Sequence, residues 1–371
     1  MIDPTMEGSA SGRGLSVVRW LGLTLNLFVL ALLLSAMRWE LVSAVVGAFG
    51  PPWWISLPLV GLLLCAATSA LWWRAPAGRT RHVAIWTAAA GGMVATLAPA
   101  MHLRAYSIER VTFAGGDIRI AAWVYVPRSP ARHAAVIVIP GSAPFKAGFY
   151  DVWADRVTRR GLVVIVPDKR GVGGTGGEFE RENNGSLANL SRLAADVVAA
   201  VQYAGTRSDV QADHIGVLGL SQAGWVGPMA AVQSRDIAFM AYITAPTVSG
   251  REERIWSELR GDDAGVALRT RRASEQTLDT VTAGGVDARP RLAALTIPGY
   301  WLFGTDDNSI PTRRSVQVLD SLVRNGHRYT YDTISGAGHL VAQRRRGSLV
   351  PSIAPASWSG LLGWLEARAG P

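Results

Sequence analysis

The chain has 371 residues, 49% of them apolar, with 40 glycines and 19 prolines, which is enough for one large domain or a domain with an appendage. This composition excludes a disordered or collagen-like chain. The single cysteine, Cys65, excludes an intrachain disulfide and any paired-cysteine metal or redox motif. The net charge is +9, but the sequence contains no cluster of basic residues interleaved with aromatic residues. We therefore expect no nucleic-acid partner.

Mean hydropathy is positive, at +0.19, because long apolar runs lie in the first 104 residues. The three runs lie near residues 20–37, 53–73 and 83–101. Trp20 and Trp39 are nineteen residues apart, as are Trp53 and Trp72, and each pair therefore spans roughly 28 Å, close to the hydrocarbon thickness of a bilayer. We expect residues 1–104 to form an N-terminal membrane region of about three transmembrane helices. The alternative is a set of buried helices in a soluble protein.

The arginines around these runs predict sidedness. With three spans, the N-terminus and loop 74–82 share one side and carry five arginines, whereas the other side has three arginines next to the spans, Arg38, Arg104 and Arg110. The positive-inside rule then places residues 105–371 outside the cytoplasm, in a multi-pass membrane protein. If the glycine-rich third run does not span, this domain lies in the cytoplasm instead.

Residues 105–371 begin with two extended runs, 107–113 and 117–126, joined by Gly115-Gly116, which predicts a β-hairpin. Short apolar runs then alternate with helical patterns. The predicted strands are 134–139, 162–167, 214–220, 237–244, 298–304 and 329–334. The predicted helices are 149–160, 187–204, 222–233, 312–325 and 356–368. Strands that are apolar on both faces and alternate with helices predict an α/β domain with a mostly parallel sheet flanked by helices.

The first of these strands ends in the tight turn Pro140-Gly141-Ser142-Ala143-Pro144. Backbone N–H groups in such a turn can bind a developing negative charge, as an oxyanion hole requires. We choose the Ser142 N–H as one donor. The second candidate donor is the N–H of Gln222, further along the chain.

The stretch Gly171-Val172-Gly173-Gly174-Thr175-Gly176 matches a dinucleotide-binding pattern, with Asp196 about twenty residues further on. A dinucleotide site requires this loop to open a helix at once. Here Gly177-Glu178-Phe179-Glu180 leads into a turn at Asn183-Asn184-Gly185 instead. We therefore predict no cofactor site in this loop.

Strand 214–220 runs into Gly219-Leu220-Ser221-Gln222-Ala223-Gly224 and then into an apolar helix. Small residues two positions before and after the serine allow a sharp strand-to-helix turn that projects the hydroxyl clear of the sheet. Ala223 stands where the usual motif has glycine. The pattern makes Ser221 a candidate nucleophile, and the alternative is a serine that caps an ordinary helix.

Residues 246–297 interrupt the alternation of strands and helices. The segment is rich in Arg and Glu and partly helical, at 251–259 and 273–282. It falls between two strands, over the expected carboxyl edge of the sheet. Because ligands bind at that edge in open α/β sheets, the segment predicts a small helical cap over a ligand crevice.

A serine hydroxyl needs an imidazole to take its proton and a carboxylate to fix the tautomer of that imidazole. In a fold of this type they follow in the order Ser, acid, His, each just past a strand end. Strand 298–304 is followed by Thr305-Asp306-Asp307, and strand 329–334 by Ser335-Gly336-Ala337-Gly338-His339. His339 is the candidate base, while Asp306 and Asp307 compete for the acid role. The six histidines show no metal-ligand spacing.

Taken together, five segments resemble the α/β-hydrolase superfamily, more narrowly the branch of dienelactone hydrolases, acyl-CoA thioesterases and prolyl-oligopeptidase-like esterases. They are Ile139-Pro140-Gly141-Ser142, Pro167-Asp168-Lys169-Arg170-Gly171-Val172-Gly173, Gly219-Leu220-Ser221-Gln222-Ala223-Gly224, Gly304-Thr305-Asp306-Asp307 and Gly338-His339. The resemblance covers about residues 105–369. It implies an α/β-hydrolase fold with Ser221 as nucleophile, Asp307 as acid and His339 as base. Pro140 departs from the histidine that many members have before the oxyanion glycine.

The leading hypothesis is a membrane-anchored serine hydrolase that cleaves a carboxylic ester without cofactor or metal. The alternatives are a thioesterase, peptidase or acyltransferase on the same residues and, from another class, a catalytically silent membrane interaction module. The expected partners are the membrane and a small-molecule or lipid-like acyl substrate. Substrate identity and oligomeric state stay open at this point.

Overall fold

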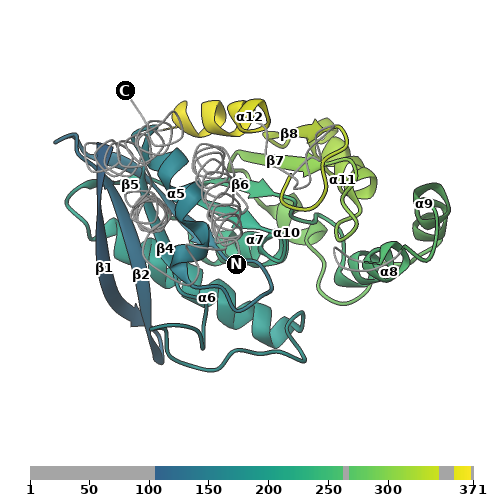
Figure 1. The fold of residues 1–371 in the computed structure, drawn as a ribbon, viewed down its shortest axis with the longest axis horizontal. Coiled ribbons are helices and arrows are strands. Elements are labelled where there is room, and N and C mark those ends of the chain that lie inside the picture. The colour runs from purple at the N-terminus through teal and green to yellow at the C-terminus, as the bar shows by residue number, and fades with distance from the viewer. Residues whose placement is uncertain (1–104, 262–266, 342–354, 369–371) are drawn as a thin grey trace, which may run out of the picture. The chain divides into compact units, whose positions relative to one another are not determined.

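A computed structural model describes residues 105–261, 267–341 and 355–368 (Figure 1). The three predicted membrane spans, near 20–37, 53–73 and 83–101, lie outside the described residues. Within the described ranges, no helix combines the length and the apolar character needed to cross a bilayer.

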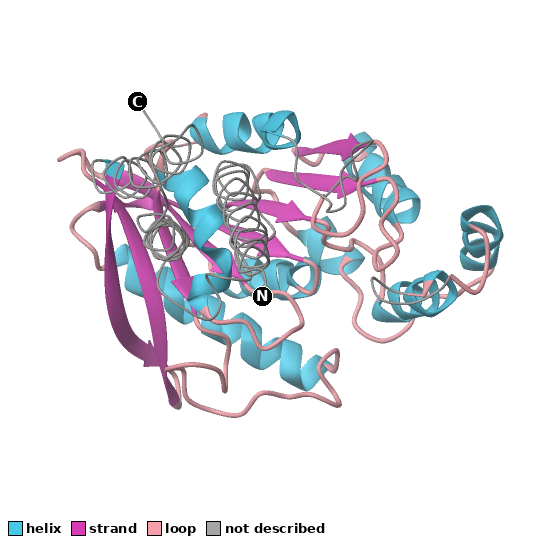
Figure 2. Ribbon diagram, in the orientation of Figure 1, coloured by secondary structure: helices cyan, strands magenta, loops and turns pink. Residues whose placement is uncertain are grey.

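The described residues are built around one eight-stranded sheet (Figure 2). Its strand order is β1-β2-β4-β3-β5-β6-β7-β8; β2 pairs antiparallel with β1 and with β4, and all other neighbouring strands pair parallel. The strands are β1 (Tyr106–Gly115), β2 (Ile118–Pro127), β3 (His133–Ile139), β4 (Val163–Pro167), β5 (Val210–Leu220), β6 (Ile237–Ile243), β7 (Gly299–Gly304) and β8 (Tyr329–Ile334). The predicted hairpin and all six predicted strands are present.

The central strands are covered on both faces. Every residue of β3 and of β7 is buried, as their continuous apolar sequences predict. Strand β5 begins at Val210, earlier than the predicted residue 214, because its first residues extend beyond the covered part of the sheet, where Ala212 and Asp213 are exposed. An apolar run therefore marks only the buried part of that strand.

Helices form a layer on each face of the sheet (Figure 1). On one face, α6 (Leu187–Gly205), α7 (Ala223–Gln233), α10 (Arg289–Ala294) and α11 (Thr312–Arg324) share the hydrophobic core. On the other face lie α5 (Asp151–Thr158), preceded by the 3₁₀ turn η1 (Ala147–Tyr150), and α12 (Pro355–Glu366). Trp153 of α5 packs edge to face on Trp358 of α12, with ring centroids 5.2 Å apart. All five predicted helices of the α/β pattern are present.

The segment predicted as a cap divides between two locations. Its first part forms α8 (Gly250–Arg260) and α9 (Arg271–Asp279), which extend away from the sheet layers (Figure 1). Helix α8 begins at a capping box, in which Ser249 and Glu252 satisfy each other's backbone N–H groups. The last part forms α10, which the sequence analysis did not predict and which buries Leu292 in the core. Only α8 and α9 therefore remain in a position to cover a ligand.

Candidate active site

Ser221 lies at the sharp turn between β5 and α7. Its φ is +49°, a left-handed conformation that non-glycine residues rarely adopt, and its N–H donates to the Ile243 carbonyl at 3.2 Å. Helix α7 carries buried residues on all sides from Ala223 to Ala231, so the core anchors it along its length. The strained serine is thus held between a central strand and a fully packed helix. Strained backbone conformations persist only where the surrounding structure fixes them in this way.

The alanine at position 223 fits because position 219 is glycine. A Cβ on Gly219 would lie 2.4 Å from the Ala223 Cβ, and real Cβ atoms do not approach so closely. Only one of the two positions can therefore carry a methyl group. The departure from the usual motif leaves the turn intact.

Asp307 and His339 are brought together at the carboxyl ends of β7 and β8. The Asp307 carboxylate is fully buried, and its Oδ2 lies 2.9 Å from Nδ1 of His339. Its Oδ1 accepts hydrogen bonds from the N–H groups of Ser309 and Ile310, both at 2.8 Å. Asp306 is exposed, and its carboxylate accepts only a long 3.4 Å hydrogen bond from the hydroxyl of Thr305 among the contacts of the described residues. The geometry therefore favours Asp307 over Asp306 as the partner of the imidazole.

The loop that carries His339 packs directly on the end of β7. A Cβ on Gly304 would lie 2.2 Å from the Ala337 carbonyl oxygen, so only glycine permits this approach. The Asp306 N–H donates to the same carbonyl at 2.8 Å. Leu340 and Val341, which follow the histidine, both have positive φ. The acid loop and the histidine loop thus form one packed unit.

The cap helices also contact the acid loop. Trp256 of α8 donates its indole N–H to the Asp307 carbonyl at 3.3 Å, and the Arg271 guanidinium donates to the same oxygen at 3.2 Å. Trp256 is buried, and the Arg271 guanidinium lies over its ring. Burial and the nearby Arg260 lower the pKa of Arg271. The cap therefore helps to fix the backbone of the candidate acid.

A cavity of about 330 Å³ opens beside these groups. Its lining residues come from the oxyanion turn, the serine turn, α8 and the histidine loop, and include Gly141, Ser142, Ser221, Glu253, Ser257 and His339. The stacked rings of Phe145 and Phe149, with centroids 4.0 Å apart, give one wall an apolar surface. Ser221 and His339 thus line one cavity that has both apolar and polar walls.

The two predicted oxyanion donors lie at this cavity and at the serine turn. The Gly141 N–H donates to the Tyr150 hydroxyl at 2.9 Å and so already has a partner. Burial raises the pKa of Tyr150, which therefore stays protonated. Among the described residues, neither the Ser142 N–H nor the Gln222 N–H donates a hydrogen bond. Both groups can therefore donate to a substrate oxygen.

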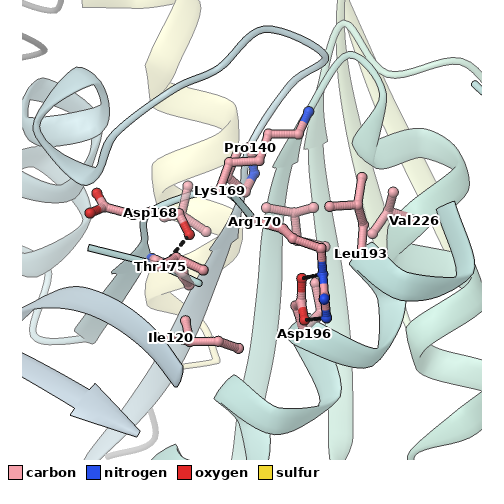
Figure 3. A pocket seen from close by; sticks show the side chains of 13 residues that line it. Ile120, Pro140, Asp168, Lys169, Arg170, Thr175, Leu193, Asp196 and Val226 are labelled. Carbon is pink, nitrogen blue, oxygen red and sulfur yellow. Dashed lines mark hydrogen bonds and ion pairs between the residues drawn. The ribbon is translucent and has the colours of Figure 1, made fainter. Parts of the chain in front are cut away.

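The glycine-rich loop after β4 does not open a helix, since the next helix, α6, begins at Leu187. The Asp168 carboxylate accepts hydrogen bonds from the Ala147 N–H at 2.7 Å and from the Gly174 N–H at 2.9 Å. Asp196 forms a two-point ion pair with Arg170, at 2.9 and 2.6 Å (Figure 3). These polar groups therefore support the loop itself.

Lys169 and Asn184 belong to the surroundings of the site, although the sequence analysis assigned them no role. Lys169 is buried next to Pro140 at the end of β3 (Figure 3). It borders a cavity of about 30 Å³, which has room for about one water molecule. The sequence signal was weak, because Lys169 stands out only as a charged residue two positions after the apolar strand β4.

Comparison with known proteins identifies both fold and family. The model of the prolyl oligopeptidase family matches residues 150–350. Among solved structures, the esterase Pf2001 of Pyrococcus furiosus has a TM-score of 0.52 at 14% identity and covers 73% of this chain and 94% of its own. DcsB, solved with a substrate analogue, has a TM-score of 0.51 at 15% identity and covers 72% of this chain and 100% of its own. No curated protein sequence matches significantly. At these identities the structures show the fold alone, and with the strand order they confirm the predicted α/β-hydrolase fold.

Proposed function

The chain belongs to the prolyl oligopeptidase family and is a serine hydrolase, and we propose that it cleaves carboxylic esters through an acyl-enzyme on Ser221. One observation carries this proposal: the 2.9 Å contact between Asp307 and His339 stands beside a cavity that Ser221 and His339 both line. The strained conformation of Ser221 supports its role as nucleophile.

The proposed chemistry follows from the hydrogen bonds of the site. His339 donates its Nδ1 proton to Asp307, which leaves Nε2 as the basic nitrogen. The Ser221 hydroxyl attacks the ester carbon and passes its proton to Nε2, and the oxyanion binds the Ser142 and Gln222 N–H groups. The intermediate expels the alcohol, which takes the proton from His339. Water then attacks the acyl-enzyme with His339 again as base, and this releases the acid and restores Ser221.

An acyl group with apolar character fits the cavity. Phe145 and Phe149 offer a stacked aromatic wall, while Glu253 and Ser257 of α8 supply polar groups to the same cavity. An ester demands less of the site than an amide, because its alcohol leaves more readily than an amine. The apolar wall therefore favours a small-molecule or lipid-like acyl ester as substrate.

The family match favours peptide hydrolysis as the second candidate function. Three substrates with the same acyl group, joined as ester, thioester or amide, separate the possibilities. We expect the purified chain to turn over the ester with the highest kcat/KM. A higher value for the amide would identify a peptidase, and a higher value for the thioester a thioesterase. A folded chain inert to all three would support a catalytically silent module.

We further propose that residues 1–104 anchor the hydrolase in a membrane, with the catalytic domain outside the cytoplasm. The long charge-free runs and their flanking tryptophans support this proposal. Protease added to intact cells is expected to digest residues 105–371, whereas a cytoplasmic domain would be cut only after the cells are lysed.

A further inference from the structure

Lys169 joins the two backbone segments that carry the candidate oxyanion donors. Its Nζ donates to the Gly141 carbonyl at 2.5 Å, to the Ser142 carbonyl at 3.0 Å and to the Gln222 side-chain oxygen at 2.9 Å. The side chain is only 4% exposed, and Lys169 forms no ion pair with any described residue. All three protons of the buried ammonium are thus directed at neutral oxygens around the site.

The contact with the Gly141 carbonyl determines where the Ser142 N–H points. In a trans peptide, the carbonyl of one residue and the N–H of the next point in opposite directions, and the described residues contain no cis peptide bond. Because the Gly141 carbonyl is bonded to Lys169, the Ser142 N–H points away from the lysine. The same Ser142 lines the catalytic cavity.

Asn184 closes a ring of hydrogen bonds with this lysine. The Gln222 Nε2 donates to the Asn184 side-chain oxygen at 3.0 Å, and the Asn184 Nδ2 donates to the Ser142 carbonyl at 2.7 Å. Lys169 bonds both Gln222 and Ser142 and completes the ring. The ring therefore ties the backbone of the oxyanion turn to the side chain of Gln222 in the serine turn.

We propose that Lys169, as an ammonium ion, is a positioning residue that aims the Ser142 and Gln222 N–H groups at the oxyanion of the reaction. The inference rests on the proposed function. A lysine suits this place because its ammonium is a compact charge with three donors, whereas a guanidinium is a planar fork. The chain has only one other lysine, Lys146, among its 37 basic residues.

Protonation of Lys169 matters because a neutral amine has two donors and a lone pair. Loss of the proton would turn that lone pair toward one of the three oxygens and release it. Burial lowers the pKa of Lys169 to about 7. We therefore expect kcat to decline as pH rises through about 7.

Global stability is expected to change in the opposite direction. In the unfolded chain the lysine pKa is near its ordinary value of 10.5. Between about pH 7 and pH 10 the unfolded state therefore binds more protons than the folded state, and the free energy of unfolding rises with pH. Opposite trends in activity and stability would separate positioning of the site from a merely structural role.

The test compares Lys169→Met with Lys146→Met, an exposed lysine whose side chain makes no hydrogen bond or ion pair with the described residues. With p-nitrophenyl acetate, Lys169→Met is expected to lower kcat on the order of 10²-fold while KM stays unchanged. Affinity for a trifluoromethyl ketone, whose adduct with the serine carries an oxyanion, should fall by a similar factor. The decline of kcat above about pH 7 should disappear. Lys146→Met should behave as the wild type in all three measurements.

If Lys169→Met does not fold, Asn184→Ala is the variant that tests the inference. Asn184 is only partly buried, and its loss opens the ring at the Ser142 carbonyl. A lower kcat and a weaker trifluoromethyl ketone complex in this variant would support the inference. Wild-type values in folded Lys169→Met, or in Asn184→Ala when the first variant is unfolded, would overturn it. Such a result leaves the proposed function standing, whereas a wild-type chain inert to every acyl substrate overturns the proposed function itself.

Discussion

Ser221→Ala is expected to lower kcat for p-nitrophenyl acetate by about 10⁶-fold and to abolish labelling by a fluorophosphonate probe. The substitution removes the hydroxyl that the strained residue between β5 and α7 carries. It leaves the fold unchanged, because alanine is smaller and adopts the φ of +49° no less readily than serine. Hydrolysis measured over hours and probe labelling on a gel check this expectation.

A matched control for this variant is Ser257→Ala, on cap helix α8. Ser257 lines the same cavity but lies on a regular helix away from the turn. The control should still be labelled by the probe. Thermal unfolding of both variants should match the wild type. Labelling that persists in Ser221→Ala and is lost in Ser257→Ala would mean that the nucleophile has been misassigned.

Asp307→Asn is expected to lower kcat by about 10⁴-fold. The Asp307 Oδ1 faces the N–H groups of Ser309 and Ile310, so the asparagine must turn its carbonyl oxygen toward them. Its amide then donates to Nδ1 of His339, which shifts the ring proton to Nε2. An imidazole in that tautomer cannot accept the serine proton. Steady-state kinetics at neutral pH measure the loss.

Asp306→Asn is the control for this substitution. Asp306 is exposed, and its carboxylate accepts from the Thr305 hydroxyl, whereas Nδ1 of His339 bonds to Asp307. Its loss should leave kcat close to the wild-type value, since exposed charges contribute little. A larger loss in Asp306→Asn would show that the neighbouring aspartates have been assigned in the wrong order, and equal losses would contradict the choice of Asp307 alone.

The sheet could be predicted from sequence because a strand that is buried on both faces consists of consecutive apolar residues. Strands β3 and β7 read as unbroken apolar runs, and no polar residue interrupts them. Helix α10 has no comparable sequence pattern. It has six residues, begins at Arg289-Pro290 and contributes one buried leucine, so no helical period could emerge. Its place is decided by packing on α7 and α11, which are distant in sequence.

Part of the candidate site could likewise be predicted from the sequence, and part could not. The serine turn and the order of serine, acid and histidine follow from short motifs, because each group must come just after a strand. The motif alone left Asp306 and Asp307 in competition, the family resemblance implied Asp307, and the coordinates favour the same residue. Adjacent residues differ little in sequence context, but only one carboxylate reaches His339.

By itself, the amino-acid sequence predicted an α/β domain in residues 105–371, the α/β-hydrolase fold and the short segments of the candidate site. Only the tertiary structure decided how Lys169, Gln222 and Asn184 close a ring around Ser142. The physical reason is separation along the chain. Lys169 lies 28 residues from Gly141 and 53 from Gln222, and its hydrogen bonds exist only after the sheet has brought the ends of β3, β4 and β5 together.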